Sequence, residues 1–237
     1  MSITDNLLSV RARVAAACQA VGRDPGSVRL LAISKTQPAS LVRQAIQAGC
    51  QAFGENRVQE MVAKAGAVGP GAQWSLVGHL QRNKAALALS VMGELQSLDS
   101  IRLADVLQRH LAVSARRLPV LIEVNTSGEA SKHGIAPDEV LAFTAAVAAY
   151  PNLRPVGLMT VAHPDPARAA AGFDQLAQLR EQLRRRDGGG WPELSMGMSG
   201  DFESAIAHGS TCLRIGTAIF GARPAGAPGG RDETIEG

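Results

Sequence analysis

The chain has 237 residues, of which 46% are hydrophobic and 19% are charged, so it can bury a sizeable core and is not disordered throughout. Its formal net charge of +3 at pH 7 is too small for a DNA-binding field, and 3% aromatic residues are too few for a nucleic-acid stacking platform. The three cysteines lack CxxC spacing, which argues against a disulfide scaffold and a zinc site. Cysteines of this kind favour a reducing compartment, so we expect a cytoplasmic protein. There is neither an apolar stretch of about 18 residues nor a signal-peptide pattern, so we expect no membrane span and no signal peptide.

The first predicted element is an amphipathic helix from Ser2 to about Ala20, with apolar residues three and four positions apart. Short apolar runs then alternate with helical patterns, and these runs lie near residues 30–34, 52–54, 74–78, 95–98, 119–124, 154–161, 194–198 and 212–221. Such alternation predicts a parallel sheet covered by helices, and eight repeats favour a single (β/α)8 TIM-type barrel, an α/β fold. No helical pattern follows the last run, so we expect the extra N-terminal helix to fill the vacant place in the outer ring.

We predict one domain, because neither a linker nor an internal repeat divides the chain. The barrel is expected to span residues 1–223. A tail rich in glycine, proline and charge follows at 224–237, and we expect it to be flexible.

The loops after the last two strands have the residues of a phosphate site. Ser199 and Gly200 stand where a helix from Asp201 should begin, and Gly216 and Thr217 add a second backbone approach and a second hydroxyl. Loops after strands seven and eight commonly bind phosphate in this fold, with help from a helix dipole. An ordinary strand-to-helix turn with a serine cap explains the same residues.

Lys35 directly follows the first strand, and Arg214 lies in the last one. The two strands are neighbours in a closed barrel, and alternation places both side chains on the inner face. Two facing cations repel, which favours the uncharged amine of Lys35, and an uncharged amine beside a phosphate site suits a Schiff base with a carbonyl-bearing phosphate ester. A lysine whose stem runs along the surface to solvent is the simpler interpretation.

Three other residues at the predicted mouth have two interpretations each. His79 can contact a ligand or can be a hydrogen-bonded structural histidine. Asn56 can donate to a ligand or can cap a helix. Lys132 lies in a loop rich in glycine and serine, where solvated lysines are common. The histidines and carboxylates have no spacing typical of a metal site, so we expect no metal.

Several segments together resemble the pyridoxal phosphate homeostasis proteins, the YggS/PROSC family. They are residues 32–36 (AISKT), 53–60 (FGENRVQE), 78–84 (GHLQRNK), 124–132 (VNTSGEASK), 157–160 (GLMT), 194–199 (LSMGMS) and 214–221 (RIGTAIFG). The resemblance covers most of the chain, and its last two segments are highly specific. The sequence departs from the family's pattern at Gln37, where some relatives have a second lysine, and at Ser75, where histidine is common.

The resemblance implies a single barrel, monomeric or weakly associating, which is similar to the N-terminal domain of alanine racemase and holds pyridoxal 5′-phosphate (PLP). By position, Lys35 is similar to the lysine that forms the Schiff base, and Arg214 to the partner of the pyridine nitrogen. The expected phosphate contacts are Ser199, Gly216 and Thr217. Asn56 and His79 match positions that line the same mouth, and Lys132 matches a lysine implicated in handling the cofactor.

We expect a carrier that passes PLP to apo-forms of PLP-dependent enzymes, without robust catalysis of its own. Arg214 donates to an unprotonated pyridine nitrogen, which leaves the ring a poor electron sink. A two-base racemase needs a second base, and the single tyrosine, Tyr150, is expected at the opposite end of the barrel. His79 is the one substitute. An amino-acid racemase-like enzyme is the alternative, and a Schiff-base aldolase is a third option that leaves Arg214 without a role.

Overall fold

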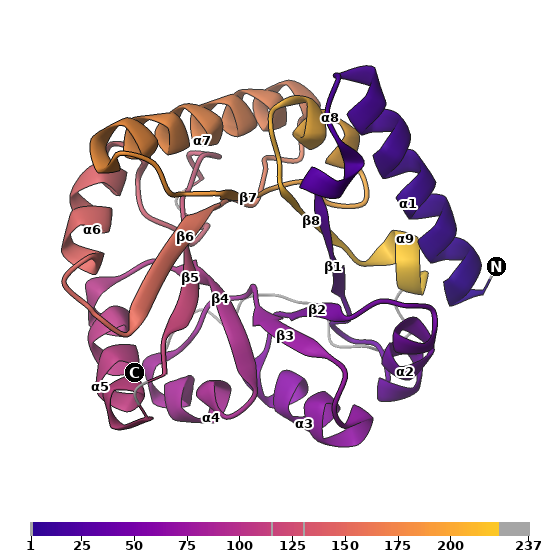
Figure 1. Ribbon diagram of the computed structural model, residues 1–237, viewed down its shortest axis with the longest axis horizontal. Coiled ribbons are helices and arrows are strands. Elements are labelled where there is room, and N and C mark those ends of the chain that lie inside the picture. The colour runs from indigo at the N-terminus through magenta and orange to yellow at the C-terminus, as the bar shows by residue number, and fades with distance from the viewer. Residues whose placement is uncertain (1, 115, 130, 223–237) are drawn as a thin grey trace.

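The fold is a closed barrel of eight parallel strands, hydrogen-bonded in chain order, and β8 pairs with β1 (Figure 1). The computed structural model describes residues 2–114, 116–129 and 131–222. The strands are β1 (Arg29–Ile33), β2 (Ala52–Glu55), β3 (Gln73–Leu76), β4 (Met92–Leu98), β5 (Leu118–Glu123), β6 (Leu153–Met159), β7 (Glu193–Ser195) and β8 (Cys212–Ile215). The predicted barrel is confirmed, whereas the predicted tail at 224–237 lies outside the described residues.

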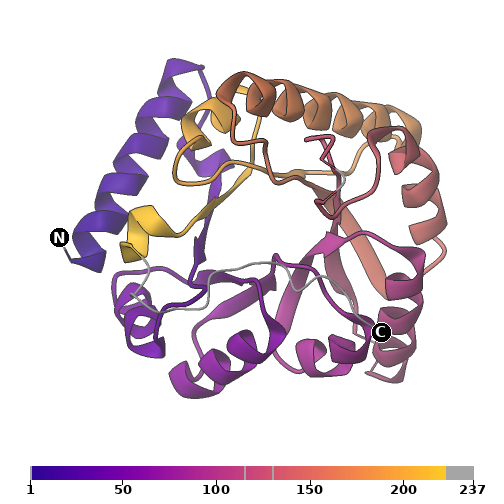
Figure 2. The same ribbon diagram turned by 180° about the vertical axis from the view of Figure 1, so that it is seen from behind.

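Helices surround the barrel on all sides, as Figures 1 and 2 show from its two ends. They are α1 (Ile3–Ala20), α2 (Ala39–Gln47), α3 (Val58–Val68), α4 (Ala85–Leu89), α5 (Ile101–Ser114), α6 (Val140–Val147), α7 (Pro166–Asp187), α8 (Phe202–Ala207) and α9 (Thr217–Phe220). Three short 3₁₀ turns are η1 (Pro25–Ser27), η2 (Arg82–Lys84) and η3 (Pro137–Glu139). Within the described residues, no helix is long and apolar enough to cross a bilayer.

The N-terminal helix completes the outer ring, as predicted. Ser2 caps α1, because its hydroxyl accepts from the Asp5 amide at 3.1 Å while the Asp5 carboxylate accepts from the Ser2 amide at 3.0 Å. The buried stripe of α1 is Ile3, Leu7, Val10, Val14 and Cys18. This stripe packs α1 against the barrel, with α2 and α8 on its two flanks and α9 on its inner side (Figure 1).

The prediction of one strand over residues 212–221 without a following helix was wrong. Strand β8 ends at Ile215, and the Gly216 carbonyl accepts from the amides of Ile219 and Phe220, both at 2.9 Å, which begins the helical turn α9. Both apolar side chains are buried against the core. A short apolar run of this kind is buried in either conformation, so its pattern does not distinguish strand from helix.

Polar side chains fill the barrel interior toward the amino ends of the strands. Arg29 donates to Glu94 at 2.8 Å and to Glu193 at 3.1 Å, and Ser75 and Gln96 also donate to Glu94, at 2.8 and 2.7 Å. The main hydrophobic core instead lies between the sheet and the helices. Strands β1, β3, β4 and β7 are therefore joined through hydrogen bonds inside the barrel as well as through the sheet.

Candidate functional site

The predicted site residues all lie toward the carboxyl ends of strands, on the side where barrels of this type have their functional loops. Each lies in a strand or in the loop after it: Lys35 follows β1, Asn56 follows β2, His79 follows β3 and Ser199 follows β7. Arg214 lies in β8, and Gly216 and Thr217 follow that strand. Because all the strands are parallel and the sheet is closed, these loops share one rim.

Lys35 lies in a turn with unusual backbone geometry. Thr36, the next residue, has a positive φ of 65°, which is uncommon for a β-branched residue. The carboxylate of Glu60 on α3 accepts from the Thr36 amide at 2.6 Å. Strained conformations persist where surrounding contacts hold them, and they gather at functional sites. The turn that carries Lys35 is therefore held from outside by α3.

A buried lysine from α3 completes this support. Lys64 Nζ donates to the Ser34 carbonyl at 2.5 Å, to Glu55 at 2.7 Å and to Glu60 at 2.6 Å. The Ser34 hydroxyl also donates to Glu55, at 2.6 Å. The side chain of Lys64 is 6% exposed and that of Glu55 is fully buried. This Lys64 network ties the end of β1, the end of β2 and helix α3 together beneath Lys35.

Burial dominates the electrostatics of the Lys64 network. It raises the pKa of the Glu55 carboxyl, because desolvation disfavours the charged form, and the Lys64 ammonium and the Ser34 hydroxyl only partly counter this. The role of Lys64 is hard to predict from sequence, because Glu60 and Lys64 are four residues apart and look like a solvated pair on a helix surface. One signal was present: Lys64 continues the apolar stripe of Val58 and Met61 at a spacing of three.

Arg214 is buried inside the barrel as part of a chain of hydrogen bonds. It donates to the Ser195 hydroxyl and to the Thr160 carbonyl, both at 2.7 Å. Ser195 in turn donates to Gln96 Oε1 at 2.7 Å, and Gln96 Nε2 donates to Glu94. This order of donors and acceptors fixes the Gln96 amide and leaves Ser195 Oγ free to accept from Arg214.

The guanidinium of Arg214 keeps its charge although the residue is only 5% exposed. Burial lowers its pKa, because desolvation disfavours the cation, and the nearby carboxylates of Glu123 and Asp201 work in the opposite direction. Arginine starts so far above neutrality that it remains protonated. Arg214 pairs with Leu31 of β1, as expected for neighbouring strands, so it lies deeper in the barrel than Lys35.

The loops after β7 and β8 meet at Ser199. Its hydroxyl oxygen accepts from the Ala218 amide in the first turn of α9 at 3.3 Å, which joins Ser199 to the Gly216–Thr217 segment. Thr217 is exposed, and a Cβ placed on Gly200 would meet no atom within 4 Å. The two predicted phosphate loops therefore lie side by side, with a hydroxyl and open backbone facing outward.

Asn56 and His79 are brought together by Gly78. A Cβ on Gly78 would lie 2.3 Å from the Asn56 carbonyl oxygen, so only glycine allows the loops after β2 and β3 to approach this closely. Ser97 on β4 donates to the Gly78 carbonyl at 2.7 Å and fixes the same loop from the other side. His79 Nδ1 lies 3.1 Å from Asp99 Oδ2.

Lys132 and Tyr150 lie in two different parts of the barrel. Lys132 lies between the loops after β5 and β6, where Nζ donates to the Ala162 carbonyl and pairs with Glu129, both at 3.2 Å. Tyr150 lies before β6, at the amino end of the strands, and its hydroxyl donates to Asp105 on α5 at 2.6 Å. The expected position of Tyr150 away from the rim is confirmed.

The chain matches known proteins over nearly its whole length. The family described as alanine racemase, N-terminal domain, matches residues 6–224. A pyridoxal phosphate homeostasis protein of Pseudomonas aeruginosa is 43% identical over 230 residues, which are 96% of this chain and 98% of that protein. One of Escherichia coli K12 is 42% identical, over 93% of this chain and 97% of that protein. The chain belongs to the pyridoxal phosphate homeostasis family.

Solved structures agree with this family assignment. PipY of Synechococcus elongatus, solved with PLP bound, is 33% identical, has a TM-score of 0.81, and is covered in full by 93% of this chain. Alanine racemase of Corynebacterium glutamicum has a TM-score of 0.69 at 18% identity, and 94% of this chain covers 62% of that one. The second likeness shows that the homeostasis family shares its barrel with the racemases.

Proposed function

We propose that this protein binds PLP at the rim of its barrel and carries it reversibly for use by other proteins. The observation that carries the proposal is that one rim presents Lys35, the buried cation Arg214, and the hydroxyls of Ser199 and Thr217. A relative with a third of its residues identical, PipY, holds PLP in its crystal structure.

The residues present fit a phosphorylated pyridine aldehyde. Ser199, Gly216 and Thr217 offer hydroxyls and the amides of a helix start to the phosphate, and the open space at Gly200 lets the ester approach the backbone. Arg214 donates to two uncharged acceptors, Ser195 and the Thr160 carbonyl, while the nearby carboxylates of Glu123 and Asp201 offset part of its charge. The hydroxyls and amides of the phosphate loops, together with this buried cation, favour an anionic ligand at this end of the barrel.

We assign the aldehyde of the cofactor to Lys35. When bound, PLP supplies an aldehyde that a lysine amine captures reversibly as a Schiff base. The chain has four lysines in all, at positions 35, 64, 84 and 132. Lys64 is buried among three acceptors, Lys84 belongs to η2 and Lys132 lies between the loops after β5 and β6, whereas Lys35 directly follows β1, the strand beside β8.

Arg214 favours storage of the cofactor over catalysis. The Arg214 guanidinium would donate a hydrogen bond to the ring nitrogen of bound PLP and would not give up its proton, so the ring would be a weak electron sink. The second base of a two-base racemase would have to face Lys35 across the ring. Tyr150 is bonded to Asp105 at the other end of the barrel, which supports a carrier.

A racemase-like enzyme is the second candidate, favoured by the barrel shared with alanine racemase and by His79 on the rim. Exchange of the α-proton of a free amino acid separates the two functions. An enzyme exchanges it at about 1 per second or faster, whereas a carrier does not. We further propose that the protein is a monomer and that it passes PLP to apo-forms of PLP-dependent enzymes. We also propose that it acts in the cytoplasm, since its three cysteines are free and buried.

The phosphate loops provide a direct test of cofactor binding. We expect the double variant Ser199→Ala, Thr217→Ala to bind PLP at least about tenfold more weakly in an equilibrium titration of visible absorbance, because two charge-assisted hydrogen bonds are lost. Ser131→Ala, at an exposed serine of the loop after β5, is the matched control and should bind as the unaltered protein does. Unchanged affinity in the double variant contradicts the phosphate assignment.

A further inference from the structure

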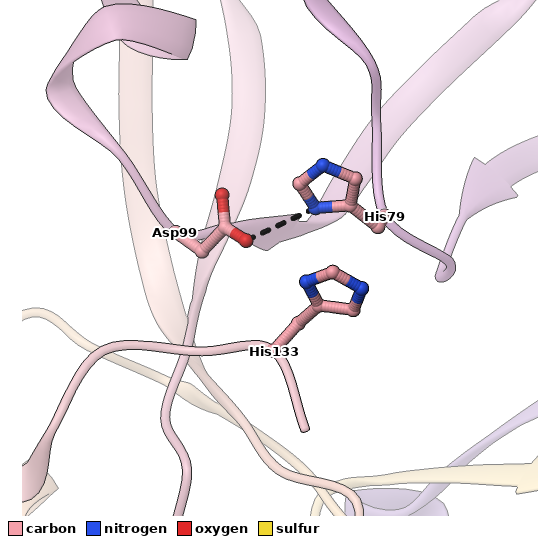
Figure 3. Close-up of side chains that lie close together, drawn as sticks. All are labelled: His79, Asp99 and His133. Atoms are coloured by element: carbon pink, nitrogen blue, oxygen red, sulfur yellow. Dashed lines mark hydrogen bonds and ion pairs between the residues drawn. The ribbon is translucent and has the colours of Figure 1, made fainter. Parts of the chain in front are cut away.

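Three potential metal ligands converge on the rim, from the loops after β3, β4 and β5 (Figure 3). They are His79, Asp99 and His133. One ligand atom from each lies within 4.8 Å of the others. The two imidazole rings stack nearly parallel, with centroids 4.2 Å apart and planes inclined by 12°. In Figure 3 both rings turn a nitrogen toward the Asp99 carboxylate.

The Asp99 carboxylate is incompletely satisfied. Its side chain is 11% exposed, and Oδ2 lies 3.1 Å from His79 Nδ1. Its other oxygen, Oδ1, is buried and has no hydrogen-bond partner among the residues that the structure describes. A buried polar atom without a partner is costly, and such atoms in native proteins point to an ion, a water or a functional role.

We propose that His79, Asp99 and His133 bind a divalent transition-metal ion of the Zn²⁺ class. Ligands about 2.1 Å from such an ion are about 3.0 to 3.4 Å apart, depending on the coordination geometry. The separation of 3.1 Å between His79 Nδ1 and Asp99 Oδ2 already matches this range. His133 is exposed on a loop, so its ring can turn out of the stack and move the roughly 1.5 Å that brings the 4.8 Å spread into this range.

The donor set determines the class of ion. Two imidazoles and one carboxylate suit Zn²⁺, Co²⁺ or Ni²⁺, whereas Mg²⁺ and Ca²⁺ prefer oxygen ligands alone. Three protein ligands leave positions for water or for a further ligand, as in open zinc sites. The ion would lie on the rim at the loops after β3, β4 and β5, away from the loops after β7 and β8 that carry Ser199 and Thr217.

The metal site does not rest on the proposed function, because none of the phosphate-loop residues is a ligand and the test uses the metal without PLP. The test is a calorimetric titration of tag-free, chelator-treated full-length protein with Zn²⁺. We expect saturable binding of one ion per chain. Visible absorption of the Co²⁺ complex reports the same site independently of heat.

The ligand variants decide the proposal. We expect His133→Ala and Asp99→Asn each to weaken Zn²⁺ binding by at least about tenfold. His110→Ala is the matched control, because it removes an exposed histidine on α5, away from the rim, and it should bind as the unaltered protein does. His133 is an exposed loop residue, so its variant keeps the fold, as circular dichroism will show. Absence of saturable binding, or equal affinity in His133→Ala and the unaltered protein, overturns the site.

Discussion

Lys64→Met should destabilise the protein in a way that depends on pH. The substitution keeps an aliphatic side chain but removes the ammonium that donates to Ser34, Glu55 and Glu60. Glu60 is partly exposed and still bonded to the Thr36 amide, so solvent can replace its lost partner. Glu55 is fully buried and retains only the Ser34 hydroxyl, so most of the loss falls on Glu55.

The magnitude follows from leaving one buried charge without its partner. Removing one member of a buried ion pair costs about 3–5 kcal/mol, and we expect this loss in the free energy of unfolding at pH 8. Burial already raises the pKa of Glu55, and loss of Lys64 raises it further. When the pKa of a carboxyl group is higher in the folded than in the unfolded state, the protein loses stability as pH rises from the unfolded-state pKa through the folded-state pKa. The deficit should therefore be smaller at pH 5 than at pH 8.

The assay is urea unfolding followed by circular dichroism at pH 5 and pH 8. Lys84→Met is the control, since it makes the same chemical change at a partly exposed lysine in η2. Adding Glu55→Gln to Lys64→Met removes the stranded charge and should restore part of the stability at pH 8. A loss below about 1 kcal/mol at both pH values, or no rescue by Glu55→Gln, would refute this account of the buried network.

Two further substitutions test the geometry of the rim. Gly78→Ala places a Cβ 2.3 Å from the Asn56 carbonyl oxygen. It should therefore lower the free energy of unfolding in urea by about 1–3 kcal/mol and weaken PLP binding. Gly93→Ala is the control, because its Cβ would meet its nearest atom at 3.5 Å and should change neither quantity. Equal effects of the two would contradict the close approach. Tyr150→Phe removes a bond to Asp105 at the far end of the barrel, so PLP affinity should not change; a weaker titration would return Tyr150 to the site.

Much of the fold could be predicted because eight apolar runs alternate with amphipathic helices, a pattern that favours a closed parallel barrel. Asp165 caps α7 and Pro166 lies in its first turn, a local pattern that the sequence alone reveals, since these residues act through backbone geometry. Helix α9 could not be predicted, because Ile219 and Phe220 are buried in either conformation.

The sequence could not reveal contacts between side chains that are far apart along the chain and meet only in the folded protein. His79, Asp99 and His133 belong to three separate loops, so no spacing predicts that their side chains meet. Lys64 looks like one half of a surface pair with Glu60, and only the packing of α3 against β1 and β2 shows that it is buried. By contrast, Lys35 and Arg214 could be placed on neighbouring strands because barrel closure joins the first strand to the last.

The most direct test of the central claim is to reduce the PLP-loaded protein with borohydride and to map the modified peptide. We predict a pyridoxyl group on Lys35 and on none of the other three lysines, and no stable modification in Lys35→Ala. Modification of Lys64, Lys84 or Lys132 in place of Lys35, or a saturated protein with no modified lysine, would contradict the proposal that Lys35 holds the cofactor.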